Sequence, residues 1–402
     1  MFTRIVLLVG LCAGCGAAPV DKSNDIVVGA LLPFTGILGA TGINLEQALI
    51  MAVEAINKSS VSGRQIRLVS RDTHSQVTIG TKAAYELIDA GAVAVIGGES
   101  DELSEIIAPA FEAKQVVFIS PGVSSWPLNA VSELTYWYRT TTSPNTLGTE
   151  LAERAFADGV RKLAILEVGS DYSIRFSTAM ADKFTGPSLG GTVVAVHNVS
   201  DSQTSYAAEL REIITAAPDA ILLVADPSTG ATIVDEFAAL ESNIRPLWYL
   251  APTLAVDGFV RNIPPGLLDG MVGVRPAVTD SGDRYATAFS QHWNGDAPLN
   301  PAYFYYDSMA LLGMALASSS FTDGGRPDPA SLRRAVSEAA KPTGTFVLWD
   351  GLTAGITQAA AGQKVYYAGL TGVLEFDSDN NRRQGTSDLW KIEGQQILKV
   401  TP

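Results

Sequence analysis

The chain has 402 residues, against a usual domain size of roughly 100 to 200, so we expect two or three domains with ample core. Apolar residues make up 47% and charged residues 17% of the chain, which excludes a disordered protein. Lys and Arg number 28 against 42 Asp and Glu, and the net charge of −14 disfavours binding to nucleic acid or to anionic lipid head groups.

The first residues have the composition of an export signal. Arg4 precedes the apolar run 5–11, which is too short to span a bilayer because a transmembrane helix needs about 20 apolar residues. Ala13-Gly14-Cys15 resembles the lipobox of bacterial lipoproteins, although Cys12 stands where that pattern prefers Leu. We therefore expect a lipoprotein signal peptide over 1–14, lipidation of Cys15 and a tether over 15–24. A plain signal peptide with two incidental cysteines is the alternative.

No cysteine follows Cys15. Cleavage before that residue removes Arg4 and leaves a mature chain with a net charge of 27 − 42 = −15 and no pair of cysteines. A disulfide, a cysteine-ligated metal and thiol catalysis are thereby excluded. The expected location is the bacterial cell envelope, on its periplasmic or extracellular face.

From Asp25 onwards, short β-branched runs alternate with helical patterns, which is typical of a parallel sheet covered by helices. The helix expected over 44–58 has Leu45, Leu49 and Ile56 on one face and Asn44 as its cap. The strands predicted for this first series are 26–32, 65–70, 93–97, 116–120 and 136–140.

A second series of the same kind begins at Ser143, which caps a helix with Pro144 in its first position and Gly159 at its end. Residues 280–340 are expected to be helical, and 365–400 to be rich in strands. The strands predicted for the second series are 162–166, 192–197, 220–224, 246–250 and 271–274. The fold class is therefore α/β, with two similar, doubly wound halves.

Polar residues follow the predicted strands of both halves, at the edge where open α/β sheets bind ligands. They are Thr35, Gly36, Thr41, Ser100, Asp101 and the run 120–125 in the first half, and the runs 169–172 and 226–229 in the second. Taken singly, each hydroxyl or acid can equally cap the helix that follows it. Their convergence in both halves favours a ligand cleft between two lobes.

The sequence matches the motifs of enzymes only weakly. Glycines 36, 39 and 42 with Asp72 outline a dinucleotide site, but the spacing is not G-x-G-x-x-G and Pro33 interrupts the turn. His74, His197 and His292 show no metal-ligand spacing, and neither G-x-S-x-G nor H-E-x-x-H occurs. Glu99 with Asp101 can do acid–base work, but acids at a helix start are more often caps. We expect no enzyme, no metal and no cofactor, with a dinucleotide-dependent enzyme as a remote alternative.

The runs 26–36, 117–122 and 367–377, together with Asp171-Tyr172 and Tyr306-Asp307, resemble the type I periplasmic substrate-binding proteins of the branched-chain amino acid (leucine/isoleucine/valine-binding) group. The resemblance covers nearly all of residues 25–392. It implies two lobes joined by three hinge crossovers, formed by 24–140 plus 274–380 and by 141–273 plus 381–402. It also implies a monomeric subunit of an ABC importer that passes a small polar ligand, an amino acid above all, to a membrane permease. A ligand-sensing receptor of the same fold is the alternative.

The resemblance also implies a set of ligand contacts. The Gly122 backbone and the Ser124 hydroxyl would hold the ligand carboxylate, and Tyr172 would close over it from the second lobe. Thr41 stands where the family has an aromatic residue, and Asp101, beside Ser100, where it has a serine. No acid stands near 250–253, where the family's glutamate meets the ligand ammonium, so Asp226 or Asp101 must replace it, or the ligand is neutral or amide-like. Thr253 and Tyr303 complete the expected site.

Overall fold

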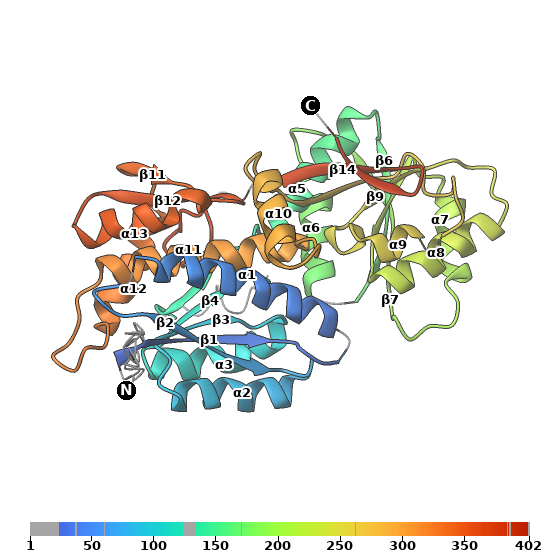
Figure 1. Cartoon of the computed structure of the whole chain (residues 1–402). Coiled ribbons are helices and arrows are strands. Elements are labelled where there is room, and N and C mark those ends of the chain that lie inside the picture. Colours follow the sequence, from blue (N-terminus) through green and yellow to red (C-terminus); the bar gives the residue numbers. More distant parts are fainter. Residues whose placement is uncertain are drawn as a thin grey trace, which may run out of the picture.

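The computed structural model describes residues 24–36, 38–59, 61–123, 134–169, 171–261, 263–383, 385 and 387–400. Their strands form two large sheets and one small one, and the two large sheets lie in separate bodies (Figure 1). We call the body of the first large sheet the first lobe and that of the second the second lobe. Two α/β lobes confirm the predicted fold class.

The first sheet has the order β2-β1-β3-β4-β5, and every neighbouring pair is parallel. Helices cover both of its faces, as the alternating pattern predicted. Its strands are β1 (Ile26–Leu32), β2 (Ile66–Asp72), β3 (Ala94–Gly97), β4 (Val117–Ser120) and β5 (Trp137–Arg139), and its first helices are α1 (Gly39–Asn57), α2 (Val77–Asp89) and α3 (Asp101–Ala113).

Helix α1 begins at Gly39, five residues before the predicted cap at Asn44. A Cβ on Gly42 would lie 2.2 Å from the carbonyl oxygen of Pro33, so glycine is what lets the first turn pack against the end of β1. The side chain of Asn44 instead donates a hydrogen bond to the Ala297 carbonyl at 2.9 Å. The predicted start was wrong because a long-range contact uses this asparagine.

The second sheet has the order β15-β14-β10-β9-β8-β6-β7. Its parallel part, β7-β6-β8-β9-β10, repeats the strand order of the first sheet, which confirms two similar halves, and β14 and β15 add an antiparallel edge. Its strands are β6 (Lys162–Val168), β7 (Thr192–Val199), β8 (Ala220–Val224), β9 (Leu247–Leu250), β10 (Val272–Pro276), β14 (Ser387–Glu393) and β15 (Gln396–Lys399).

Helix α5 begins as predicted, with the Ser143 hydroxyl accepting a hydrogen bond from the Thr146 amide at 3.2 Å and Pro144 in the first turn. The helices of the second lobe are α5 (Pro144–Ala157), α6 (Asp171–Thr185), α7 (Ala207–Ala216), α8 (Pro227–Ala239), η2 (Pro252–Leu254) and α9 (Asp257–Arg261).

The chain then returns to the first lobe, where α13 is a helix that the sequence pattern did not predict. The elements of this part are α10 (Gly282–His292), α11 (Asn300–Ser318), α12 (Pro329–Ala340), η3 (Trp349–Gly351) and α13 (Leu352–Ala360), with the small sheet β11 (Thr345–Val347), β12 (Val365–Gly369) and β13 (Gly372–Val373). The predicted strand-rich tail is thus divided, because β12 and β13 stay in the first lobe whereas β14 and β15 join the second sheet.

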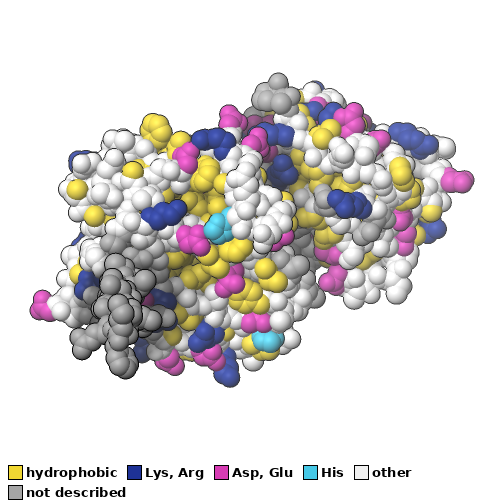
Figure 2. All heavy atoms as spheres, viewed as in Figure 1, with side chains coloured by type: hydrophobic (Ala, Val, Ile, Leu, Met, Phe, Trp, Pro, Cys, Tyr) yellow, Lys and Arg dark blue, Asp and Glu magenta, His cyan; other side chains and the backbone are white. Residues whose placement is uncertain are grey.

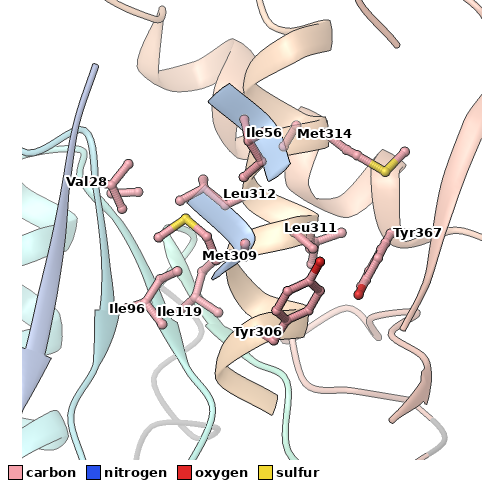
Figure 3. Close-up of a cluster of buried hydrophobic side chains, with 14 of the residues drawn as sticks. Val28, Ile56, Ile96, Ile119, Tyr306, Met309, Leu311, Leu312, Met314 and Tyr367 are labelled. Atoms are coloured by element: carbon pink, nitrogen blue, oxygen red, sulfur yellow. The ribbon is translucent and has the colours of Figure 1, made fainter. Parts of the chain in front are cut away.

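Helix α11 is the centre of the first lobe and is buried along nearly its whole length. Its Met309 and Leu312 point toward Val28, Ile96 and Ile119 of the sheet, and the opposite face, with Tyr306 and Leu311, turns toward Tyr367 of β12 (Figure 3). A helix enclosed on all sides is apolar all round.

Three crossovers join the lobes, over 140–143, 277–281 and 374–386. The predicted boundary at 273/274 falls inside β10, which continues to Pro276 because it pairs with β14 over that length. Arg139 forms a parallel bridge with Asn381, so the first and third crossovers lie side by side. Among the described helices, we find none with the length and apolar character that a membrane span requires.

Candidate ligand-binding site

The strand order of each sheet defines where a ligand is expected. In a doubly wound sheet, ligands bind beyond the carboxyl ends of the strands, at the point where the chain reverses its winding direction. That point lies between β1 and β3 in the first sheet and between β6 and β8 in the second. The loops after these strands and the first turns of the helices that follow them contain five of the nine predicted ligand-binding residues: Thr41, Ser100, Asp101, Tyr172 and Asp226.

Asp72, at the end of β2, holds the loop after β1 in place. Its Oδ1 accepts hydrogen bonds from the backbone amides of Phe34 (2.9 Å), Thr35 (3.2 Å) and His74 (2.8 Å), and its Oδ2 accepts one from the Thr35 hydroxyl at 2.7 Å. Partial burial opposes ionisation, but the bonds from His74 and Thr35 outweigh it and lower the pKa of Asp72. Asp72, the acid that a dinucleotide site would use, therefore holds the loop after β1 in place.

Ser100 and Asp101 begin helix α3. The Ser100 hydroxyl accepts a hydrogen bond from the Leu103 amide at 3.2 Å, which is the capping role that the sequence left open. Asp101 lies in the first turn, and its charge acts on Tyr172 of the second lobe.

Tyr172, in the first turn of α6, lies within electrostatic reach of Asp101 on the other lobe. Burial raises the pKa of its phenol, and the negative charge of Asp101 raises it further. Its ring stacks on Phe176, with centroids 6.2 Å apart and planes 14° apart. The charge of one predicted site residue thus acts on another that belongs to the opposite lobe.

Arg139 is a charged residue at this junction that the sequence analysis missed. It ends β5, at the first crossover, and is only 2% exposed. Burial lowers its pKa to about 10, an effect that the charges of Asp101 and Asp377 oppose and that of Arg175 on α6 strengthens. The sequence did contain a signal for this residue, because Arg139 directly follows the apolar run 136–138 of a predicted strand. A charged side chain at the end of a buried strand needs polar groups around it, since an unpaired buried charge is costly.

Asp226 follows β8, the strand of the second lobe that corresponds to β3 of the first, and caps helix α8. Its Oδ1 accepts hydrogen bonds from the Ser228 and Thr229 amides, at 2.9 and 3.1 Å. Partial burial acts to raise the pKa of Asp226, but the hydrogen bonds from Ser228 and Thr229 outweigh this effect, and the pKa is lowered. Thr253 lies beside it, with its hydroxyl donating to the Ala225 carbonyl at 2.6 Å.

The remaining predicted residues are more dispersed. Thr41 lies in the first turn of α1, and its amide donates to the Leu38 carbonyl at 2.9 Å. Gly122 is exposed, with open space where a Cβ would stand. Tyr303, in the first turn of α11, packs on Tyr285 with ring centroids 5.3 Å apart. Ser124 and Cys15 lie outside the described residues.

The part of the chain that the structure describes contains no group of His, Cys, Asp and Glu able to hold a metal ion. Acidic and basic side chains are interspersed over the face shown in Figure 2, without a field of one sign.

The fold and the paired strand ends are those of a two-lobed solute-binding protein. A profile of the family described as "Periplasmic binding protein" matches residues 25–389, and the chain belongs to this family. The family consists of binding proteins, which confirms the prediction that the chain is not an enzyme. The chain is also 21% identical over 393 residues to Glutamate receptor 3.4 of Arabidopsis thaliana, covering 93% of this chain but only 39% of the receptor.

Solved structures show the same fold at low sequence identity. A leucine-binding protein of Thermotoga maritima has a TM-score of 0.73 and 18% identity, covering 94% of this chain and 98% of its own. A branched-chain amino acid transporter substrate-binding protein of Streptococcus pneumoniae, in complex with isoleucine, has a TM-score of 0.73 and 17% identity, covering 94% and 100%. A solute-binding protein of R. palustris, in complex with benzoate, has a TM-score of 0.69 and 16% identity, covering 94% and 95%.

Proposed function

We propose that this protein is the extracytoplasmic binding component of an ABC importer and captures a small polar solute, an α-amino acid, between its lobes. The observation that carries the proposal is the matching of strand ends: Asp101 follows β3 of the first lobe and Tyr172 follows β6 of the second, each at the point where its sheet reverses its winding direction. The fold that the chain shares with the leucine-binding and isoleucine-bound proteins supports it. Membrane permease subunits are the proposed partners.

Capture proceeds by hinge closure. The Gly122 backbone and the Ser124 hydroxyl hold the ligand carboxylate from the first lobe, and Tyr172 closes over it from the second. The lobes that move are those expected from the sequence, 24–140 plus 274–380 and 141–273 plus 381–402, except that residues 274–276 belong to the second lobe because β10 extends to Pro276.

The ligand ammonium needs an acid, because a buried unpaired charge is costly. Asp101 and Asp226 are the two candidates, one on each lobe, and Thr41, Ser100, Thr253 and Tyr303 complete the proposed lining. A neutral or amide-like ligand remains the alternative at this position.

The protein acts as a monomer anchored to the bacterial cell envelope. Residues 1–14 direct export, and Cys15 is lipidated after cleavage. The tether 15–24 then leads from the anchor to β1, leaving the lobes outside the cytoplasmic membrane.

A ligand-sensing receptor is the second candidate. The similarity to Glutamate receptor 3.4 favours it, because 93% of this chain matches a protein that is named as a receptor. The matched region is 39% of that protein. A permease gene and an ATPase gene next to this one favour import, whereas a neighbouring kinase gene favours sensing.

A thermal-shift screen against amino acids and related solutes tests the proposal, because a ligand at 100 times its dissociation constant stabilises the folded state by about 2.7 kcal/mol. Binding of a solute that stabilises the protein should also lower the radius of gyration of the protein in small-angle scattering, because the lobes close. The absence of any stabilising solute, or a hit without compaction, counts against a two-lobed trap.

A further inference from the structure

Glu99 lies directly before Ser100 and Asp101 of the proposed site. It follows β3 by two residues, at the reversal point of the first sheet, and precedes the cap Ser100. Its Oε1 accepts a hydrogen bond from the hydroxyl of Thr73, a fully buried residue that follows β2.

The second carboxylate oxygen of Glu99 is different. Oε2 is buried and has no hydrogen-bond partner among the described residues. Burial raises the pKa of this carboxyl, the hydrogen bonds from Thr73 and from the backbone amide of Glu99 itself lower it, and the nearby Asp72 charge raises it, for a net rise. The charge of Glu99 also reaches Tyr305 of α11, where it adds to the rise that burial causes in the pKa of that phenol.

A second unpartnered polar atom lies at the same edge of the sheet. Ser120 ends β4, is 0% exposed, and its Oγ also has no partner among the residues described. Ile96 of β3 pairs with Ile119 of β4, so Ser120 stands beside Gly97, two residues before Glu99. Buried polar groups are nearly always paired, and two orphans on adjacent strand ends therefore need an explanation.

We infer that Glu99 is a ligand-contacting residue and that the ligand presents a nitrogen-bound hydrogen-bond donor other than an α-ammonium (a further ammonium, a guanidinium or an amide N–H) to its Oε2, beside the Ser120 hydroxyl. This inference rests on the proposed capture of a solute between the lobes. It narrows the ligand from any α-amino acid to a solute that bears such a donor.

Glu112 is the matched control, because it is an acid of the same lobe with both oxygens in use. Its Oε1 accepts from the Thr135 hydroxyl and its Oε2 from the Tyr136 amide, each at 2.8 Å. Replacing a Glu whose carboxylate is fully hydrogen-bonded by Gln lowers the stability of the protein, because those bonds are weakened. A buried carboxylate that is kept for a ligand destabilises the ligand-free protein, so its replacement by Gln does not lower the stability. Glu99→Gln should therefore leave the melting temperature of the ligand-free protein equal or higher, and Glu112→Gln should lower it. A drop for Glu99→Gln as large as that for Glu112→Gln overturns the inference without any ligand.

Calorimetry on the wild type and both variants tests binding, with L-leucine, L-glutamine, L-lysine, L-arginine, agmatine and putrescine as probes. We expect a probe with a nitrogen donor beyond its α-amine to bind more tightly than L-leucine, to lose about tenfold to hundredfold in affinity in Glu99→Gln, and to keep its affinity in Glu112→Gln.

The outcomes separate this inference from the proposed function. Tightest binding of L-leucine, unchanged in Glu99→Gln, overturns the inference and leaves amino acid capture standing. Binding of agmatine or putrescine alone, weakened in Glu99→Gln, supports the inference and overturns the choice of an α-amino acid. Binding of no probe by the wild type overturns both.

Discussion

The guanidinium of Arg382 donates a hydrogen bond to the backbone carbonyl of Thr140 at 3.2 Å, which joins the third crossover between the lobes directly to the first. The same side chain donates to the Thr371 hydroxyl at 3.2 Å, and Thr371 in turn donates to the fully buried Asp307 at 2.7 Å. Burial lowers the pKa of Arg382 to about 10, and the charge of Asp307 acts against this. Two of the three hinge segments are thus fastened to the first lobe.

Replacing Arg382 with Met should lower the free energy of unfolding by about 3 to 5 kcal/mol, because it removes a buried cation that donates hydrogen bonds to the carbonyls of Val373 and Thr140 and whose charge opposes that of the buried Asp307. Urea denaturation measures this change. The neighbouring Arg383→Met is the control, since Arg383 forms only an exposed ion pair with Glu375 at 3.6 Å, worth about 0 to 1 kcal/mol. Equal losses in the two variants would show that the buried network does not stabilise the hinge.

Asp226→Asn separates capping from ligand binding. Asn caps helices nearly as well as Asp, so the melting temperature without ligand should hardly change, whereas Asp226→Ala should cost about 1 kcal/mol. If Asp226 meets the ligand ammonium, the Asn variant should bind more weakly by roughly 1.5 to 3 kcal/mol in calorimetry. Equal affinities move the role to Asp101.

The Asp226 cap also has a predictable pH dependence. Its pKa in the folded protein lies below the ordinary value of 3.8, so its extra stabilisation is present above that value and is lost as the pH falls through the folded pKa. Thermal melts of wild type and Asp226→Ala should therefore differ most near neutral pH, and the difference should shrink in acid. A gap that widens in acid would contradict this sign.

Tyr172→Ala should weaken ligand binding more than Tyr172→Phe, because Phe keeps the stack on Phe176 and loses only the hydroxyl. Calorimetry with the ligand from the screen gives the affinities. Small-angle scattering should show ligand-induced compaction preserved in the Phe variant. Wild-type affinity in Tyr172→Ala would remove this residue from the site.

Cys15→Ala should abolish lipidation and release the protein from stable membrane association, because no described helix spans a bilayer. Fractionation of cells and labelling with a fatty acid analogue measure both effects. If the wild type is already found in detergent-free extracts, the plain signal peptide is the correct alternative.

Local pattern was sufficient for the alternation of strands and helices, since β-branched runs and helical periodicity are properties of short segments. It predicted β1 over 26–32 and the start of α5 at Ser143 and Pro144, where cap and turn chemistry act within four residues. It also placed Asp101 after β3 and Tyr172 after β6, because the position of a residue beyond a strand follows from the order of the elements.

Tertiary structure alone decided the features that depend on residues distant in the chain. The start of α1 follows from the approach of Gly42 to Pro33 and from the use of Asn44 by Ala297, and no local signal encodes that contact. The burial of Arg139 and Arg382 beside the crossovers, and the unpartnered Oε2 of Glu99, exist only once both lobes are folded. Whether a polar side chain is a cap, a hinge contact or a ligand contact is set by which atoms surround it, and a sequence pattern contains the side chain but not its surroundings.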